Sequence, residues 1–172
     1  GEGQFVALLR RDEADVIDDS AVKDACVPLG RAELAATADF LKETVGHSLS
    51  GLCLCGGNIA AFPAHETLNF PLPPFGVVSA GVTVGECRKG RIIPHHHFFM
   101  AYGGEFSAKC VLDPADEAVA RYLAGEEISV ASAESGFAAV LLKLGDTAVT
   151  LGGGKLSGGR LKNYYPKGLR VR

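Results

Sequence analysis

The pattern that most restricts the fold is a run of apolar and glycine residues near the C-terminus. Residues 137–144 and 147–151 are rich in apolar side chains, and Gly145-Asp146 separates them. A glycine-containing dipeptide between two such runs is typical of the tight turn in a β-hairpin. Two glycine-rich segments follow, 152–155 and 157–159, where we expect loops near a third strand. The pattern predicts a small, twisted, glycine-rich β unit.

A short helix is predicted just before this β unit. Asp113 can cap its N-terminus, Pro114 suits the first turn, and Asp116 faces the positive end of the helix dipole. Gly125 is expected to end the helix. The predicted apolar face consists of Val119, Tyr122 and Leu123.

The preceding part of the chain mixes predicted helices and strands. An apolar segment at 5–9 indicates a buried strand, and the acidic segment 12–19 indicates a linker. Residues 31–45 carry apolar side chains at helical spacing, with Gly46 as the stop. The predicted buried face of this helix is Leu34, Ala38, Leu41 and Val45.

A second hairpin is predicted from 52 to 62, with its turn at residues 56–58. A proline-rich loop is expected at 63–74, followed by a strand at 77–84 and a basic loop or strand end at 85–91. A short helix is expected to start at Pro94 and to run through three histidines to Tyr102. The fold class predicted from the residues is therefore α+β.

Charge is distributed unevenly along the 172 residues, whose net charge is −3. From Lys143 onward there are seven basic residues and one acid, a net charge of +6, whereas the rest of the chain carries −9. This asymmetry indicates a local site for a polyanion. No apolar run approaches the ~20 residues that would span a membrane, so we expect no membrane contact. Five cysteines without disulfide-framework spacing favour free thiols in the cytoplasm.

The last twelve residues combine cations with two adjacent tyrosines, which is the chemistry of single-stranded or irregular RNA binding. A solvated basic tail is the alternative interpretation. Because neighbouring strand residues face opposite sides, we expect only one tyrosine to be exposed. The predicted RNA-binding residues are Lys155, Lys162, Asn163, Tyr164, Tyr165, Lys167 and Arg170. A second basic patch, Arg88, Lys89 and Arg91, would extend this surface if it lies beside the tail, although such a patch by itself is more often a solvated turn.

Other site chemistries find little support in the sequence. Three consecutive histidines, 95–97, project in different directions and suit a shared metal poorly, and Cys53-x-Cys55 adds only a weak partner. The glycines at 152–159 lack the Gly-Lys-Ser/Thr step of a phosphate-binding loop. No serine lies in a nucleophile elbow. We therefore predict no catalytic residue, no metal and no cofactor in this chain.

The C-terminal segment 161–170 closely resembles the terminal motif of bacterial Nop/Sun-type RNA cytosine-5 methyltransferases of the RsmF kind. The resemblance continues, in collinear order, through segments 1–7, 80–86, 91–95 and 122–126 and the Gly154-Lys155 step. Two positions depart from the family pattern: Gly153 stands where a tryptophan is frequent, and Tyr164 stands where a histidine is usual.

The resemblance implies three regions. Residues 1–20 would end a catalytic domain and its linker, 21–112 would form a small mixed intermediate domain, and 113–172 would form a PUA-like β-barrel with one helix. The S-adenosylmethionine pocket and the catalytic cysteines would precede Gly1.

The resemblance and the charge pattern together predict a chain that binds and orients RNA, most simply ribosomal RNA, for a catalytic domain that it lacks. Expected partners are RNA and that catalytic domain, with neither DNA nor membrane. In the alternative, the chain is a structural or protein-interaction domain that packs on the catalytic domain or on a ribosomal protein.

Overall fold

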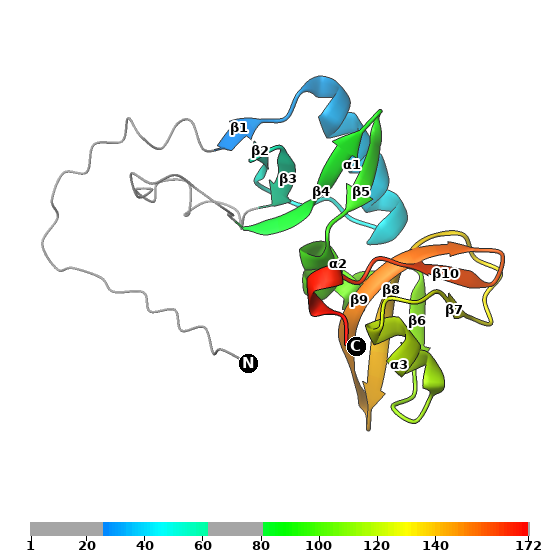
Figure 1. Ribbon diagram of the computed structural model, residues 1–172. Helices are drawn as coiled ribbons and strands as arrows, with labels where there is room; N and C mark the ends of the chain where they lie inside the picture. Colours follow the sequence, from blue (N-terminus) through cyan, green and yellow to red (C-terminus); the bar gives the residue numbers. More distant parts are fainter. Residues whose placement is uncertain (1–25, 62–80, 172) are drawn as a thin grey trace, which may run out of the picture.

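The computed structural model describes residues 26–61 and 81–171, which form two β-sheets with helices packed around them (Figure 1). The first sheet contains, in hydrogen-bonded order, β1 (Cys26–Pro28), β2 (Leu52–Cys55), β3 (Asn58–Ala61), β4 (Val82–Arg88) and β5 (Arg91–Pro94). The second contains β6 (Lys109–Leu112), β8 (Gly136–Leu144), β9 (Thr147–Ser157), β10 (Arg160–Asn163) and β7 (Ile128–Ser129). The strand expected at 5–9, the linker at 12–19 and the loop at 63–74 lie outside the described residues. The predicted α+β class is confirmed.

Helix α1 (Arg31–Thr44) lies where the sequence predicts it, but its buried face is rotated. Leu34 and Ala38 are exposed, whereas Thr37 and Thr44 are buried. Each threonine hydroxyl donates a 2.7 Å hydrogen bond to the backbone carbonyl four residues earlier, so its polar group is satisfied inside the protein. Hydrophobicity alone could not identify this face because two of its members are polar. The complete buried face is Thr37, Phe40, Leu41 and Thr44.

Both hairpins of the first sheet turn on residues with positive φ. Gly56 and Gly57 have φ of 57° and 81° between β2 and β3, which confirms the predicted hairpin. Lys89 and Gly90 have φ of 50° and 73° between β4 and β5. Segment 85–91, expected to be a basic loop or strand end, is thus a second antiparallel hairpin. The strand expected at 77–84 is described only from Val82, and it continues to Arg88.

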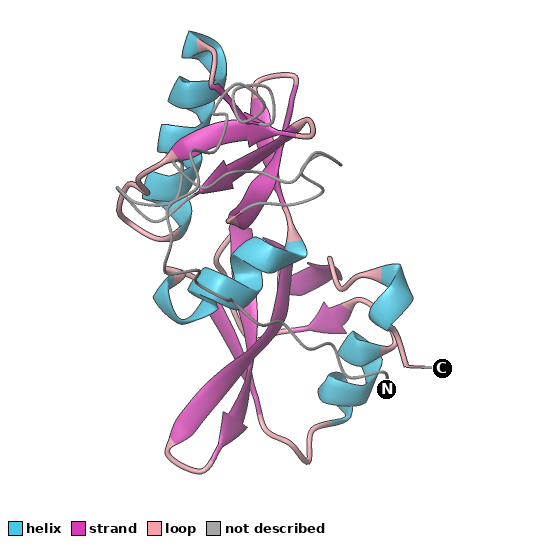
Figure 2. Cartoon of the chain, turned by 90° about the vertical axis from the view of Figure 1, so that its left-hand side faces the viewer, coloured by secondary structure: helices cyan, strands magenta, loops and turns pink. Residues whose placement is uncertain are grey.

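Helix α2 (His96–Tyr102) lies at the junction of the two sheets and packs on β4 and β9 (Figure 2). His95 is its N-cap, and the Nδ1 of that ring accepts a 3.2 Å hydrogen bond from the backbone N–H of His97. Pro94 is the last residue of β5 and does not start the helix. Phe98 and Phe99 are fully buried, so the helix joins the sheets through its apolar side chains.

The second sheet is built around the predicted hairpin, with β8 and β9 antiparallel across Gly145-Asp146. Strand β6 pairs parallel to β8 at one edge, and β10 and β7 follow β9 at the other. The prediction of a loop at 152–155 is wrong, because β9 runs without interruption to Ser157. A Cβ atom on Gly153 would lie 2.1 Å from the Phe99 ring, so these glycines permit close packing rather than a loop.

Helix α3 (Glu117–Leu123) covers the other face of this sheet. Its N-cap is Asp116, whose carboxylate accepts a 2.8 Å hydrogen bond from the N–H of Ala118. The predicted cap, Asp113, instead accepts from Ala115 in the preceding turn. Gly125 has a φ of 86° and ends the helix as expected.

Two hydrophobic clusters stabilise the molecule. The first joins both sheets, since Phe40, Phe98 and Phe99 pack with Ala139 and Leu141 of β8. The second lies between the second sheet and α3, around the fully buried Tyr122. The second sheet begins at Lys109, four residues before the boundary expected at 113, and the division into domains stays a prediction. No helix in the described parts of the chain could cross a membrane.

Candidate nucleic-acid interface

Two exposed lysines lie side by side in the second sheet. Lys155 of β9 is the register partner of Lys162 of β10 on one side and of Phe137 of β8 on the other. Directly opposite residues of an antiparallel pair project from the same face, so the three side chains form one row. The Lys155 ammonium lies 5.8 Å from the centroid of the Phe137 ring. We call Phe137, Lys155 and Lys162 the cross-strand row.

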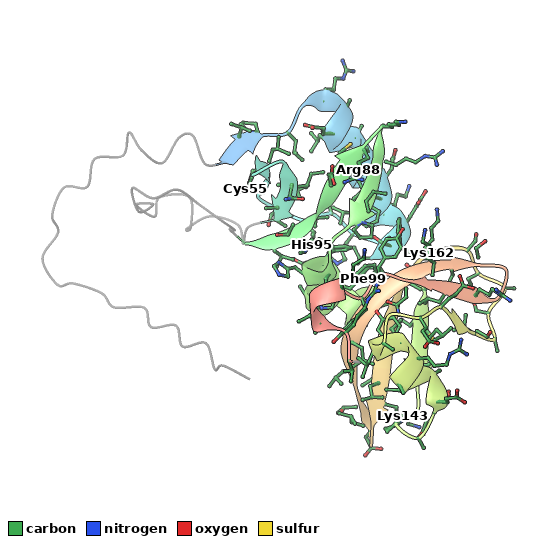
Figure 3. All side chains as sticks on the ribbon, in the orientation of Figure 1. Cys55, Arg88, His95, Phe99, Lys143 and Lys162 are labelled. Atoms are coloured by element: carbon green, nitrogen blue, oxygen red, sulfur yellow. The ribbon has the colours of Figure 1, made fainter. Side chains whose placement is uncertain are left out.

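The cross-strand row stands on the face of the second sheet that turns toward α1 and the first sheet, which together we call the first unit, the second sheet and α3 being the second. Phe137 packs edge-on against Phe40 of α1, with ring centroids 5.8 Å apart, and belongs to the first cluster. Its neighbours Ala138 and Val140 point the other way, into the second cluster. Figure 3 accordingly shows Lys162 near the junction of the two units. The row therefore places two cations and an aromatic ring at that junction.

The two adjacent tyrosines serve different clusters, and both are half-buried. The Tyr164 ring packs against Phe137, 5.8 Å between centroids, and Tyr165 packs against Tyr122 and His96 at 5.6 Å each. The expectation that one tyrosine would be exposed is wrong. Strand alternation does send them to opposite sides, but the sheet is covered on both sides. Each of the two residues keeps part of its surface exposed.

Asn163 holds the C-terminal segment against α3. Its amide nitrogen donates to the carbonyls of Tyr122 and Glu126 at 2.7 and 2.8 Å, and its Oδ1 accepts from the N–H of Tyr165 at 2.6 Å. Both amide protons are thus occupied within the protein. The geometry gives Asn163 a structural task, and its predicted RNA contact stays a prediction.

The described residues after Tyr165, up to Val171, lie against α3. The Arg170 guanidinium donates to the Tyr165 carbonyl at 3.3 and 3.4 Å and covers Gly125, where a Cβ would lie 2.2 Å from its Nε. The N–H of Val171 donates to the Leu123 carbonyl at 3.1 Å. Lys167, in a short 3-10 turn (Lys167–Leu169), remains exposed. Of these tail cations, Lys167 is therefore the more available to a ligand.

The basic residues of the sequence do not gather into one patch. Lys143 lies at the far end of the β8–β9 hairpin from Lys162, and Arg88 lies on the first unit (Figure 3). Arg88 pairs with Glu86 at 2.8 Å, and its hydrogen bond lowers the pKa of that carboxyl group. Lys89 is exposed in the turn, whereas Arg91 lies beside α1. Only part of the predicted set thus lies near the cross-strand row.

A cleft between α1 and the start of β8 is the feature that sequence reasoning missed. Phe137 lines two cavities there, of ≈300 and ≈520 Å³. Asp39 and Arg91 line the smaller cavity, and Glu43 lines both. These residues come from elements roughly a hundred positions apart, and no local pattern connects them. The alternation in 137–144 could have marked Phe137 only as a strand residue.

The histidines contribute to packing at the junction. Burial lowers the pKa of His96, and the neighbouring rings of His95 and His97 lower it further. The His96 ring stands edge-on to Tyr165, and its buried Nδ1 has no hydrogen-bond partner in the described part of the protein. Within residues 26–61 and 81–171, no three histidine, cysteine, aspartate or glutamate side chains converge as metal ligands would.

Comparison with known families adds an independent observation. A search of curated proteins found no significant match to the chain. The family model described as the methyltransferase RsmF PUA domain matches residues 109–171, which are the second sheet, α3 and the ordered tail. The C-terminal part of the chain is therefore PUA-like, and it is similar to the PUA domain of RsmF methyltransferases.

Proposed function

We propose that this chain is the RNA-binding C-terminal portion of an S-adenosylmethionine-dependent RNA cytosine-5 methyltransferase. It docks RNA, with ribosomal RNA as the expected target, and orients it for a catalytic domain outside this chain. The cofactor would be held by that catalytic domain. The observation that carries the proposal is the cross-strand row within a PUA-like domain.

The row suits a single-stranded or irregular RNA. Lysine ammonium groups bind phosphates as point charges, and each contact releases counterions. Phe137 and the half-buried Tyr164 provide aromatic surface beside these charges. Cations beside aromatic rings are the usual combination in proteins that bind single strands. Because the rest of the chain is acidic, RNA would be repelled from most of the surface and would bind at the basic residues of this row rather than at many places.

Docking makes chemical sense for a base-modifying enzyme. A target base inside a helix is out of reach, so it must be unstacked or already single-stranded. A separate binding module holds the RNA so that the reacting atom is presented repeatedly in one geometry. The shared first cluster ties the second sheet to the first unit, which would make the module rigid.

The test measures binding of an unstructured RNA oligonucleotide as a function of salt. Lys155→Glu and Lys162→Glu should each weaken binding and reduce the salt slope by about 1. Lys143→Glu is the matched control, because it makes the same charge change at the far hairpin tip. Absence of binding at low salt, or an equal loss in the control, would show that this face does not bind RNA.

A second candidate function is docking on the catalytic domain. Leu169 and Val171, at the ordered C-terminal end, are 54% and 62% exposed, which would suit an apolar protein contact. Addition of the catalytic domain, but not of RNA, would then raise the melting temperature of this chain.

A further inference from the structure

The cleft between α1 and β8 is lined by aromatic, acidic and basic side chains. Its smaller cavity of ≈300 Å³ has an aromatic wall of Phe40 and Phe137, two carboxylates from α1, and the guanidinium of Arg91 from β5. This volume is at the lower end of the ~300–1,000 Å³ typical of small-molecule sites. It therefore suits one planar ring rather than a folded partner.

The carboxylates are available for a ligand. Asp39 and Glu43 are four residues apart on α1 and so project from the same side of the helix. Both are exposed, and neither forms an ion pair or side-chain hydrogen bond with another described residue. Ionised carboxylates only accept hydrogen bonds, so the α1 wall of the cleft is suited to a ligand that presents N–H donors.

We propose that this cleft receives one unpaired base of the bound RNA, and that it prefers a base with an exocyclic amino group, such as adenine or cytosine, over uracil. The inference rests on the proposed function, because the base arrives on RNA held by the cross-strand row. It adds a recognition site to which α1 and β5, outside the PUA-like domain, contribute most of the lining, and β8 of that domain contributes Phe137.

The preference follows from hydrogen-bond polarity. Adenine N6 and cytosine N4 are amino donors that a carboxylate can accept. Uracil offers only its N3–H as a donor on this edge, and the carbonyl oxygens on both sides of it would face the lone pairs of Asp39 or Glu43 and be repelled. The Phe137 ring at the cavity wall adds stacking or edge contact, to which every base can contribute.

The charges around the cleft also separate base from backbone. Carboxylates inside the cavity repel phosphate, so a phosphate group would stay out. The Lys155 ammonium lies 5.8 Å from the centroid of the Phe137 ring, and Arg91 lines the cavity, so two cations lie close to it. A nucleotide could therefore place its base in the cleft and its phosphates on these cations.

The experiment compares fluorescence-anisotropy titrations of the intact chain with ~10-nucleotide oligo-A, oligo-C and oligo-U at low salt. The wild type should bind oligo-A and oligo-C about 5- to 10-fold more tightly than oligo-U. Asp39→Asn and Glu43→Gln keep the size but add donors, so the double variant should lose this preference chiefly by gaining affinity for oligo-U. Glu117→Gln on α3 is the control for the charge change, and it should leave the preference intact.

The outcomes are distinguishable. If the wild type binds all three oligonucleotides equally, or the double variant retains the preference, the cleft inference is overturned while RNA binding stands. If no oligonucleotide binds, the proposed function and the cleft inference both fail. Phe137→Leu, with Phe40 unchanged, should weaken the binding of oligo-A and oligo-C by about tenfold. An unchanged affinity in a folded Phe137→Leu protein would also contradict the cleft inference.

Discussion

Replacing Gly153 by alanine tests whether close packing of α2 on β9 holds the two units together. The added Cβ would lie 2.1 Å from two carbon atoms of the Phe99 ring. Ordinary carbon contacts are ~3.5 Å, so the ring must move by about 1.4 Å. Phe99 has no exposed surface and packs on Phe106, 5.2 Å between centroids, which leaves it no free space.

The magnitude follows from two opposing effects. Overpacking of a filled core costs roughly 1–3 kcal/mol, and complete loss of a buried phenylalanine costs about 3–5 kcal/mol. The position falls near the top of the first range because the ring is enclosed. Alanine also restricts the unfolded chain, which offsets roughly 0.4–1 kcal/mol. We therefore expect a net destabilisation of about 2 kcal/mol, which corresponds to a melting temperature lower by roughly 4–8 °C.

Urea unfolding and thermal melts of the wild type and the variants provide the assay. Gly104→Ala is the matched control, since no atom lies within 4 Å of its added Cβ, and it should be neutral. In a Phe99→Ala background, Gly153→Ala should cost almost nothing, because the clash has been removed. Equal effects at positions 153 and 104, or an undiminished cost in the Phe99→Ala background, would refute the packing argument. Tryptophan at 153, as in the family that this chain resembles, should be worse than alanine.

Two further predictions concern the tail and pH. Asn163→Ala removes three hydrogen bonds to the backbone and should lower the free energy of unfolding in urea by about 2–3 kcal/mol. The control is Lys162→Ala at the exposed neighbouring position, which should change stability little. An Asn163→Ala protein as stable as the wild type would show that the tail does not depend on this amide. Hydrogen bonds to the Ser48 carbonyl and, secondarily, to the Glu105 carboxylate raise the pKa of His47 above its ordinary value of 6.5. The protonated His47 ring therefore stabilises the folded protein fully below pH 6.5, and this stabilisation is lost as the pH rises through the raised pKa of the folded state. His47→Gln should therefore reduce the difference in unfolding free energy between pH values below 6.5 and pH values above the raised pKa. If the variant shows the same pH dependence of unfolding as the wild type, this reasoning is contradicted.

Local sequence patterns were sufficient for several elements. The dipeptides Gly56-Gly57 and Gly145-Asp146 predict hairpins because positive φ at a two-residue turn matches strand twist, and both hairpins are present. The C-terminal motif indicates, by its resemblance to a known family, the PUA-like region that the family model matches. These features depend on residues close together in the chain, so the sequence alone determined them.

Tertiary structure decided which faces are buried and which residues meet. The glycines of β9 lie in a strand, not in loops, because Phe99 and Tyr122 arrive from distant helices to occupy the space of absent side chains. Thr37 is buried because its hydroxyl bonds within its own helix. The cleft joins Asp39 to Phe137 across the junction of the two units. Such contacts are set by packing between remote segments, and no local periodicity encodes them.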